Sequence, residues 1–176
     1  MSSVLILTIG HSTRALDDFL DILRAHRVTR VVDIRTIPRS RHNPQFNQES
    51  LSESLKESAI DYIPMKQLGG LRDSKADSPN MGWRNSSFRG FADYMQTQEF
   101  AAGIDQLVGL AQNCQVAIMC AEVLPWRCHR SLIADALLVR GVQVEHIMTM
   151  KARSQHTLTK WAHIEGTQIT YPENHA

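Results

Sequence analysis

The sequence predicts an α/β fold: a mostly parallel sheet flanked by helices in a single domain. Two observations lead to this expectation. Short, continuous apolar runs alternate along the chain with longer stretches in which apolar residues recur at steps of three and four. Such alternation is typical of a parallel sheet with both faces covered. The chain has 176 residues, 43% of them hydrophobic and 21% charged, enough for one ordinary core, and no linker or repeat divides residues 1–176.

The N-terminal part supplies the first three expected strands. The run SVLILTIG, residues 3–10, is apolar to its end, as in a strand buried on both faces. Residues 12–26 follow with the apolar spacing of an amphipathic helix, whose first turn Ser12 or Thr13 would cap. The next three elements are a strand at residues 30–35, a polar helix at 48–59 and a brief strand at 61–65.

Two segments are expected to lack regular structure. In residues 36–47, Pro38 and Pro44 forbid it, and a loop of that length is usually functional or disordered. Residues 66–90 are rich in Gly, Ser, Asn and Asp, which favour turns. Together these two segments hold many of the chain's arginines.

Regular structure returns in the C-terminal half. Residues 91–113 have helical spacing that is interrupted near Thr97, which predicts two helices. Residues 129–141 are expected to form a helix that ends at Gly141, the usual place for a C-terminal glycine. The remaining elements are strands at residues 115–120 and 142–148, and one short helix or strand in residues 156–172.

Composition and charge set few limits on function. Nineteen Lys and Arg residues stand against eighteen Asp and Glu residues, so attraction for an anionic partner has to come from local clusters. Three cysteines cannot all pair internally, and no signal-like apolar stretch follows a basic N-terminus. No apolar run approaches the roughly 18 residues of a membrane span. We therefore expect a reduced, cytoplasmic protein that does not cross a membrane.

Polar motifs come directly after the expected strands. They are GHS at residues 10–12, DIR at 33–35, LGGLR at 68–72 and CAE at 120–122. In open α/β folds, ligands bind outside the carboxyl ends of the strands. These four motifs are therefore expected to converge on one crevice.

A basic loop suggests what that crevice binds. Arg35, Arg39, Arg41 and His42 lie within eight residues, and no acid occurs between Asp33 and Glu49. The planar guanidinium of arginine matches phosphate or carboxylate oxygens, so this loop predicts an anionic substrate. The alternative is a solvated loop whose arginines pair with acids of the helices.

An aromatic segment narrows the expected anion. In NMGWRNSSFRGF, Trp83, Phe88 and Phe91 are interleaved with Arg84 and Arg89, a mixture that can stack on bases while it contacts phosphates. A nucleotide or nucleic acid is therefore the leading class of anion. Alternatively, these aromatic residues anchor an irregular segment to the core.

His11 and Asp33 end the first two strands. His11 follows a glycine at a sharp turn, and its imidazole could act as a general acid or base because an unperturbed imidazole titrates close to neutral pH. Alternatively, His11 only hydrogen bonds the loop. Asp33 is expected to orient His11 or an arginine rather than to react.

The most crowded polar stretch is MCAEVLPWRCHR. Cys120 ends a strand, and the alternation of an extended chain would place Glu122 on the same side. Cys128, His129 and Arg130 are expected to begin the next helix. The unpaired amides and the dipole at a helix N-terminus favour an anion, either a bound phosphate or a thiolate.

Three interpretations of this stretch remain open. In the first, Cys120 or Cys128 is a nucleophile, and Glu122, His11 or His129 transfers protons, although the Cys–Arg spacing is not that of cysteine phosphatases. In the second, both thiols and a histidine bind zinc, although the thiol spacing is not CxxC. In the third, the thiols are only packed and the polar residues around them form the site.

Taken together, these motifs resemble an uncharacterised bacterial and archaeal family, domain of unknown function 488. The resemblance is carried by TIGHST, VVDIRTIPRSRHNPQF, YIPMKQLGGLR, GFADYM and IMCAEVLPWRCHRSLIADALLVRGVQVEHI, in that order over most of the chain. It implies an α/β domain but no reaction. The family signature that it implies is carried here by His11, Asp33, Arg35, Pro38, Cys120, Glu122, Cys128, His129 and Arg130.

We expect an enzyme that acts on a phosphate-bearing substrate, a nucleotide or nucleic acid, by hydrolysis or group transfer. The alternatives are a module that binds an anionic small molecule or nucleic acid without turnover, and a metal-dependent hydrolase. No cofactor is expected. The candidate catalytic residues are His11, Cys120, Glu122 and Cys128. The candidate substrate-binding residues are Ser12, Asp33, Arg35, Arg39, Arg72, His129 and Arg130.

Overall fold

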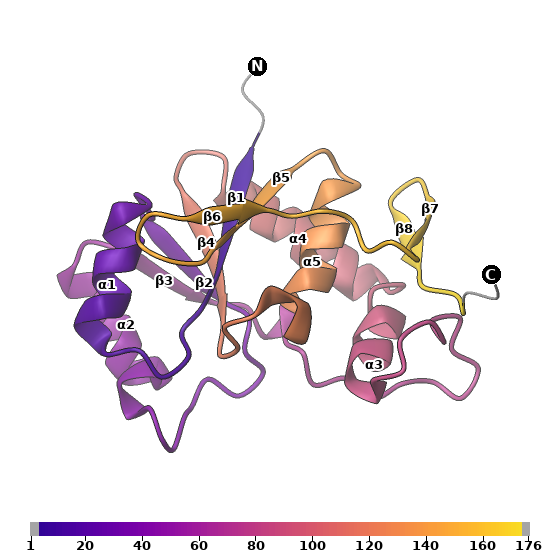
Figure 1. Ribbon diagram of the computed structural model, residues 1–176, viewed down its shortest axis with the longest axis horizontal. Helices are drawn as coiled ribbons and strands as arrows, with labels where there is room; N and C mark the ends of the chain where they lie inside the picture. Colours follow the sequence, from indigo (N-terminus) through magenta and orange to yellow (C-terminus); the bar gives the residue numbers. More distant parts are fainter. Residues whose placement is uncertain (1–3, 174–176) are drawn as a thin grey trace.

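The computed structural model describes residues 4–173, and these form a six-stranded sheet with helices on both faces (Figure 1). Its strands are β1 (Leu5–Gly10), β2 (Arg30–Asp33), β3 (Asp61–Pro64), β4 (Val116–Cys120), β5 (Gln143–Ile147) and β6 (Arg153–Gln155). They lie in the order β3-β2-β4-β1-β5-β6; all neighbours pair in parallel except β5 and β6, which are antiparallel. The predicted α/β fold with a mostly parallel sheet is therefore confirmed.

The helices form two layers. They are α1 (Leu16–Ala25), α2 (Gln48–Glu57), α3 (Ser86–Tyr94), α4 (Gln98–Leu110) and α5 (Arg130–Leu138). Two apolar clusters show which helices share a face: Phe19 of α1 and Leu55 of α2 pack with Leu7, whereas Ile104 of α4 and Leu132 of α5 pack with Ile6. Successive residues of β1 thus face opposite layers, as the alternation of a strand requires. Figure 1 shows α1 and α2 on one side of the sheet and α3, α4 and α5 on the other.

Helix starts are where the sequence prediction is partly wrong. The N-cap of α1 is Ala15, which makes no side-chain cap hydrogen bond, so neither Ser12 nor Thr13 caps this helix. The helix α3 begins inside the segment that was expected to be irregular, because Asn85 accepts hydrogen bonds from two amides of its first turn. The predicted interruption near Thr97 is confirmed, since Thr97 caps α4.

The C-terminal segment forms strands rather than a helix. A small hairpin of β7 (His163–Glu165) and β8 (Gln168–Thr170) follows β6 and lies at the α3 end of the molecule (Figure 1). A backbone hydrogen bond joins the residue after β8 to the segment before α3: the Gly82 amide donates to the Tyr171 carbonyl oxygen at 2.8 Å. In the described part of the chain, no helix combines the length and the apolarity needed to cross a membrane.

Candidate functional site

The candidate site lies at the carboxyl ends of β1 and β4. These neighbouring strands lead into helices on opposite faces of the sheet, so the loops that follow them diverge and leave a crevice, the usual ligand position in such folds. Near the strands the two loops are still paired, with the His11 amide donating to the Cys120 carbonyl oxygen at 2.9 Å. A Cβ at Gly10 would lie 1.7 Å from the Glu122 carbonyl oxygen, so only glycine permits this approach.

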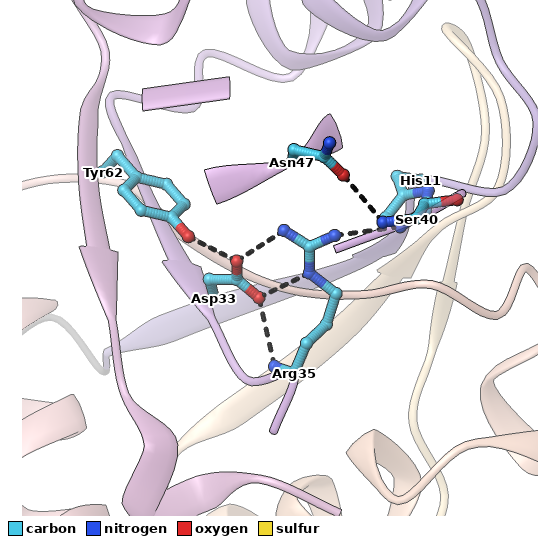
Figure 2. A network of polar contacts seen from close by, with 6 residues as sticks. All are labelled: His11, Asp33, Arg35, Ser40, Asn47 and Tyr62. Carbon is cyan, nitrogen blue, oxygen red and sulfur yellow. Dashed lines mark hydrogen bonds and ion pairs between the residues drawn. The ribbon is translucent and has the colours of Figure 1, made fainter. Parts of the chain in front are cut away.

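An ion pair at the end of β2 holds one of the site's arginines in place, and Figure 2 shows its hydrogen bonds. The Arg35 guanidinium donates from Nε and Nη2 to the two oxygens of Asp33, at 2.9 and 2.7 Å, and both side chains are buried, with exposed fractions of 6% and 1%. The Tyr62 hydroxyl donates to the same carboxylate at 2.5 Å. Burial lowers the pKa of Arg35, but the bonds to Asp33 outweigh it, and the net pKa is raised. Arg35 is thus a fixed cation whose charge Asp33 balances.

His11 sits beside this pair as a neutral imidazole. Its Nδ1 donates to the Ser12 carbonyl oxygen at 2.8 Å, so its Nε2 carries no hydrogen and accepts from Arg35 Nη1 at 3.4 Å. The ring stacks on Phe46 with centroids 4.3 Å apart. Burial is the main cause that lowers the pKa of His11 to about 4. Near pH 7 this histidine is therefore a neutral acceptor for Arg35 and carries no proton to donate from Nε2.

Behind the crevice, two buried thiols lie next to a buried cation. Burial raises the pKa of Cys120, but a hydrogen bond from Cys128, the charge of Arg130 and the Glu122 backbone outweigh it, and the net pKa is lowered. The hydrogen bond to Cys120, together with burial, raises the pKa of Cys128 well above its usual range. The charge of Arg130 thus favours an anionic sulfur at Cys120, whose Sγ lies 3.4 Å from the Glu122 carbonyl oxygen.

Within the described residues 4–173, Arg130 has no acidic partner to balance its charge. Its side chain is fully buried, with an exposed fraction of 0%. Nη2 donates to the Val123 carbonyl oxygen, while Nε and Nη1 have no hydrogen-bond partner among residues 4–173. A buried, unpaired cation costs several kcal/mol in free energy. A thiolate at Cys120 would supply the missing negative charge.

His129 is held at the start of α5 by two loops. Its Nε2 faces the carbonyl oxygens of Ile34 and Leu68, each at 3.0 Å, so Nε2 carries the hydrogen and Nδ1 is free to accept. Cys128 Sγ lies 3.5 Å from that Nδ1. Burial lowers the pKa of His129 to about 4, so the ring is neutral near pH 7. A Cβ at Gly70 would lie 2.6 Å from Nδ1, which explains the glycine there.

These groups surround two adjoining hollows. The first, which we call the Cys120 cavity, has a volume of about 330 Å³. Its apolar lining includes Ile37, Leu71 and Phe88. Its polar and charged lining consists of Arg35, Thr36, Arg39, Ser87, Cys120, Glu122, Arg127, Cys128 and His129. The second, the His11 hollow, has a volume of about 370 Å³. It contains His11 and Ser12 and shares Arg39, Ala121 and Glu122 with the first. The structure therefore brings most of the predicted site residues to one crevice.

Three of the predicted substrate-binding residues, Asp33, Arg72 and Arg130, line neither hollow. Arg72 does not line either hollow: its Nε donates to the Gly69 carbonyl oxygen at 3.2 Å, and its guanidinium carbon lies 3.6 Å above the centre of the Tyr94 ring. Arg130 lies behind the thiols rather than in the hollows. Sequence reasoning missed Arg127, which lines the Cys120 cavity. The signal for it was its place in the crowded loop after β4, between the predicted site residues Glu122 and Cys128.

The interleaved aromatic segment is divided between core and site. Phe91 is fully buried, and Arg89 is occupied with the carbonyl oxygen of Trp83 at 3.1 Å, as expected if the segment anchors itself to the core. Phe88, in contrast, lines the Cys120 cavity. Within residues 4–173, the His, Cys, Asp and Glu side chains form no group of three or more placed to hold a metal ion.

Comparison with known proteins gives one match. A family model described as "Domain of unknown function DUF488" matches residues 15–137, more than half of the chain. Neither the curated proteins nor the solved structures contain a match to the chain.

Proposed function

The chain belongs to the DUF488 family, and we propose that it is an enzyme that acts on a phosphate-bearing substrate, a nucleotide or nucleic acid, by hydrolysis or group transfer, with Cys120 as its nucleophile. The Cys120 cavity is the proposed active site. The cytoplasm is the proposed compartment, since all three cysteines are free thiols and thiols persist in reducing surroundings.

One observation carries this proposal: Arg130 is fully buried beside Cys120 and lacks an acidic partner among the described residues. The thiolate rather than the thiol is the reactive form of cysteine, and a nearby cation favours it. A thiolate at Cys120 would in turn compensate Arg130. The same pairing favours the thiolate without a histidine base.

Two exposed arginines support the choice of an anionic substrate. Arg39 comes from the loop after β2 and Arg127 from the loop after β4, and both line the Cys120 cavity. Neither guanidinium makes an ion pair or hydrogen bond with another group in residues 4–173. Each is therefore free to bind phosphate oxygens with its planar pair of N–H groups. Arg35, whose charge Asp33 balances, would add a donor but little net charge.

The proposed reaction has two steps. In the first, the Cys120 sulfur attacks phosphorus, a sulfur–phosphorus bond forms, and the bond to the leaving oxygen breaks; that oxygen takes a proton from water. In the second step, the oxygen of water, or of a hydroxyl group on a second substrate, attacks phosphorus and displaces the Cys120 thiolate. Glu122 accepts the proton that this oxygen loses.

The test measures phosphate release from a panel of nucleotides and short single-stranded RNA and DNA. We expect Cys120→Ser to abolish turnover, because a hydroxyl with a pKa far above neutral cannot replace the thiolate. The matched control is Cys114→Ser, since Cys114 lies outside the cavity and its thiol bonds the Leu110 carbonyl oxygen. Turnover that survives in Cys120→Ser would contradict the proposal. Phosphate-dependent binding without any turnover would favour the alternative, a binding module.

A further inference from the structure

A second, larger cavity lies on the other side of the short 3-10 helix η3 (Pro125–Arg127). It has a volume of about 620 Å³, and all three tryptophans of the chain line it, so we call it the tryptophan cavity. The loop after β4 contributes to both cavities: Arg127 lines the Cys120 cavity, and its neighbour Trp126 lines this one. No residue of the proposed active site lines it.

Two of the three indoles around the cavity are exposed to water, and the third is partly buried against the core. Trp83 and Trp161 are in contact, with centroids 5.0 Å apart and an angle of 66° between the rings. Trp161 is 38% exposed, and Trp126 is 62% exposed. Such exposed indoles around a hollow leave flat apolar surface open to water, which an aromatic ring would cover by stacking.

The polar lining indicates which kind of ring fits. None of the described residues that line the cavity is acidic, so a cation has nothing to pair with there. Ser131, Ser154, Gln155, Thr157 and Thr159 offer hydroxyl and amide groups, which can both donate and accept hydrogen bonds. Lys160 adds one cation at the surface. A neutral heterocycle with polar edges, attached to an anionic group, matches this combination better than a hydrocarbon ring does.

One wall of the cavity is fixed by a chain of hydrogen bonds. His156 Nε2 donates to Asp135 at 2.8 Å, His156 Nδ1 lies 2.9 Å from His146 Nε2, and His146 Nδ1 lies 2.6 Å from the Thr8 hydroxyl oxygen. Both histidines line the cavity. The buried Asp135 anchors this chain of hydrogen bonds, which fixes this wall before any ligand arrives.

We infer that the tryptophan cavity is a binding site for a nucleobase, stacked on Trp126 or Trp161 and hydrogen bonded at its edges by the hydroxyl and amide groups of the lining. The site is separate from the Cys120 cavity. Free nucleosides, nucleotides and single-stranded nucleic acid all present this ring. The inference does not depend on the proposed reaction.

Tryptophan fluorescence tests this inference directly, because every tryptophan of the chain lines the cavity. Adenosine, guanosine, cytidine and uridine are titrated into the whole protein, with excitation at the red edge of indole absorption, where these probes do not absorb. We expect saturable quenching by at least one nucleoside, with a dissociation constant of about 1 mM or tighter. Ribose 5-phosphate, which has no base, is expected to cause none.

Variants locate the binding. Trp126→Ala is expected to weaken nucleoside binding by about tenfold or more, whereas Trp126→Phe, which keeps a ring for stacking, retains most of it. Trp161→Ala provides a second test if the first variant is poorly folded. Cys120→Ser is the matched control from the other cavity and is expected to bind nucleosides as the wild type does, so failure of the proposed reaction leaves this result intact. The inference is overturned if no nucleoside quenches, if ribose 5-phosphate quenches equally, or if both alanine variants bind as before.

Discussion

At the scale of single residues, the sequence shows which groups are reactive but not which of them are charged. The four motifs after the strands did predict a common crevice, because parallel strands end at the same edge of a sheet. The protonation states depend on contacts that no local pattern contains. His11 was predicted to act as an acid or base near its ordinary pKa, yet burial lowers that pKa to about 4. Likewise, nothing in the sequence indicates that Arg130 is enclosed without an acid.

The first prediction concerns Arg130 and the ionisation of Cys120. In Arg130→Met, burial would no longer be opposed by a nearby cation, so the alkylation of Cys120 by iodoacetamide should require a higher pH than in the wild type. Arg127→Met is the matched control, because this exposed guanidinium is screened by water and should shift the profile little. The rate is followed by mass spectrometry of the Cys120 peptide. Superimposable profiles for Arg130→Met and wild type would refute the role of Arg130.

At the scale of secondary structure elements, strands were easier to predict than helix starts. Continuous apolar runs identify β1, β2 and β4 because these strands are buried on both faces of the sheet. A helix start depends on one side chain that reaches a backbone amide. Many serines and asparagines can do so, and their spacing does not decide which one does. The sequence therefore favoured Ser12 or Thr13 for α1, where neither caps, and gave no reason to begin α3 at Asn85.

The second prediction compares the N-cap of α4, which Thr97 provides, with the start of α1, which has no side-chain cap. The Thr97 hydroxyl accepts from the Phe100 amide at the start of α4, so Thr97→Ala should lower the free energy of unfolding by about 1 kcal/mol. Thr13→Ala is the matched control and should change it little, because α1 has no side-chain cap. Urea denaturation measures both variants. Equal losses from the two substitutions would contradict the assignment of the helix starts.

The third prediction concerns the attachment of the C-terminal segment to α5. The Asp135 carboxylate accepts from His156 Nε2, the Thr159 amide and the Tyr171 hydroxyl, at 2.8, 3.1 and 2.8 Å. Asp135→Asn removes the charge that all three donors share, and breaking such a buried group typically costs about 3–5 kcal/mol. Amide hydrogen exchange should rise most in residues 153–172.

Tyr171→Phe serves as the control for this prediction. It removes one of the three bonds and should cost only about 0.5–1.5 kcal/mol, with a smaller rise in exchange over the same residues. If Asp135→Asn instead raised exchange evenly across the sheet, or left residues 153–172 unchanged, Asp135 would not be what ties this segment to the helix.

At the scale of the whole molecule, buried neutral histidines make the fold sensitive to acid. Burial lowers the pKa of His11 and His129 to about 4 and that of His146 to about 3. All three values lie below the 6.5 of an unfolded chain, so the unfolded state binds more protons as the pH falls below about 6.5. The stability that these histidines contribute is therefore complete above that pH and is lost as the pH approaches 4.

The fourth prediction gives this loss a size. Between pH 7 and pH 5, each of the three histidines should reduce the free energy of unfolding by about 1–2 kcal/mol. The urea midpoint should fall smoothly across this range. In His146→Gln the total fall should be smaller, because one of the three contributions is removed. A midpoint that stays constant from pH 7 to pH 5 would show that these imidazoles are not held neutral by the fold.

The most direct test of the central claim, that Cys120 is an anion-facing thiolate, is its alkylation by iodoacetamide in the intact protein at neutral pH, with and without inorganic phosphate. Cys114 is read in the same digest as an internal reference. We predict that Cys120 reacts faster than Cys114 and that phosphate slows Cys120 alone, because a phosphate held by Arg39 and Arg127 would cover the cavity. If Cys120 instead reacts only after unfolding, or reacts equally fast with and without phosphate, the proposed active site is contradicted.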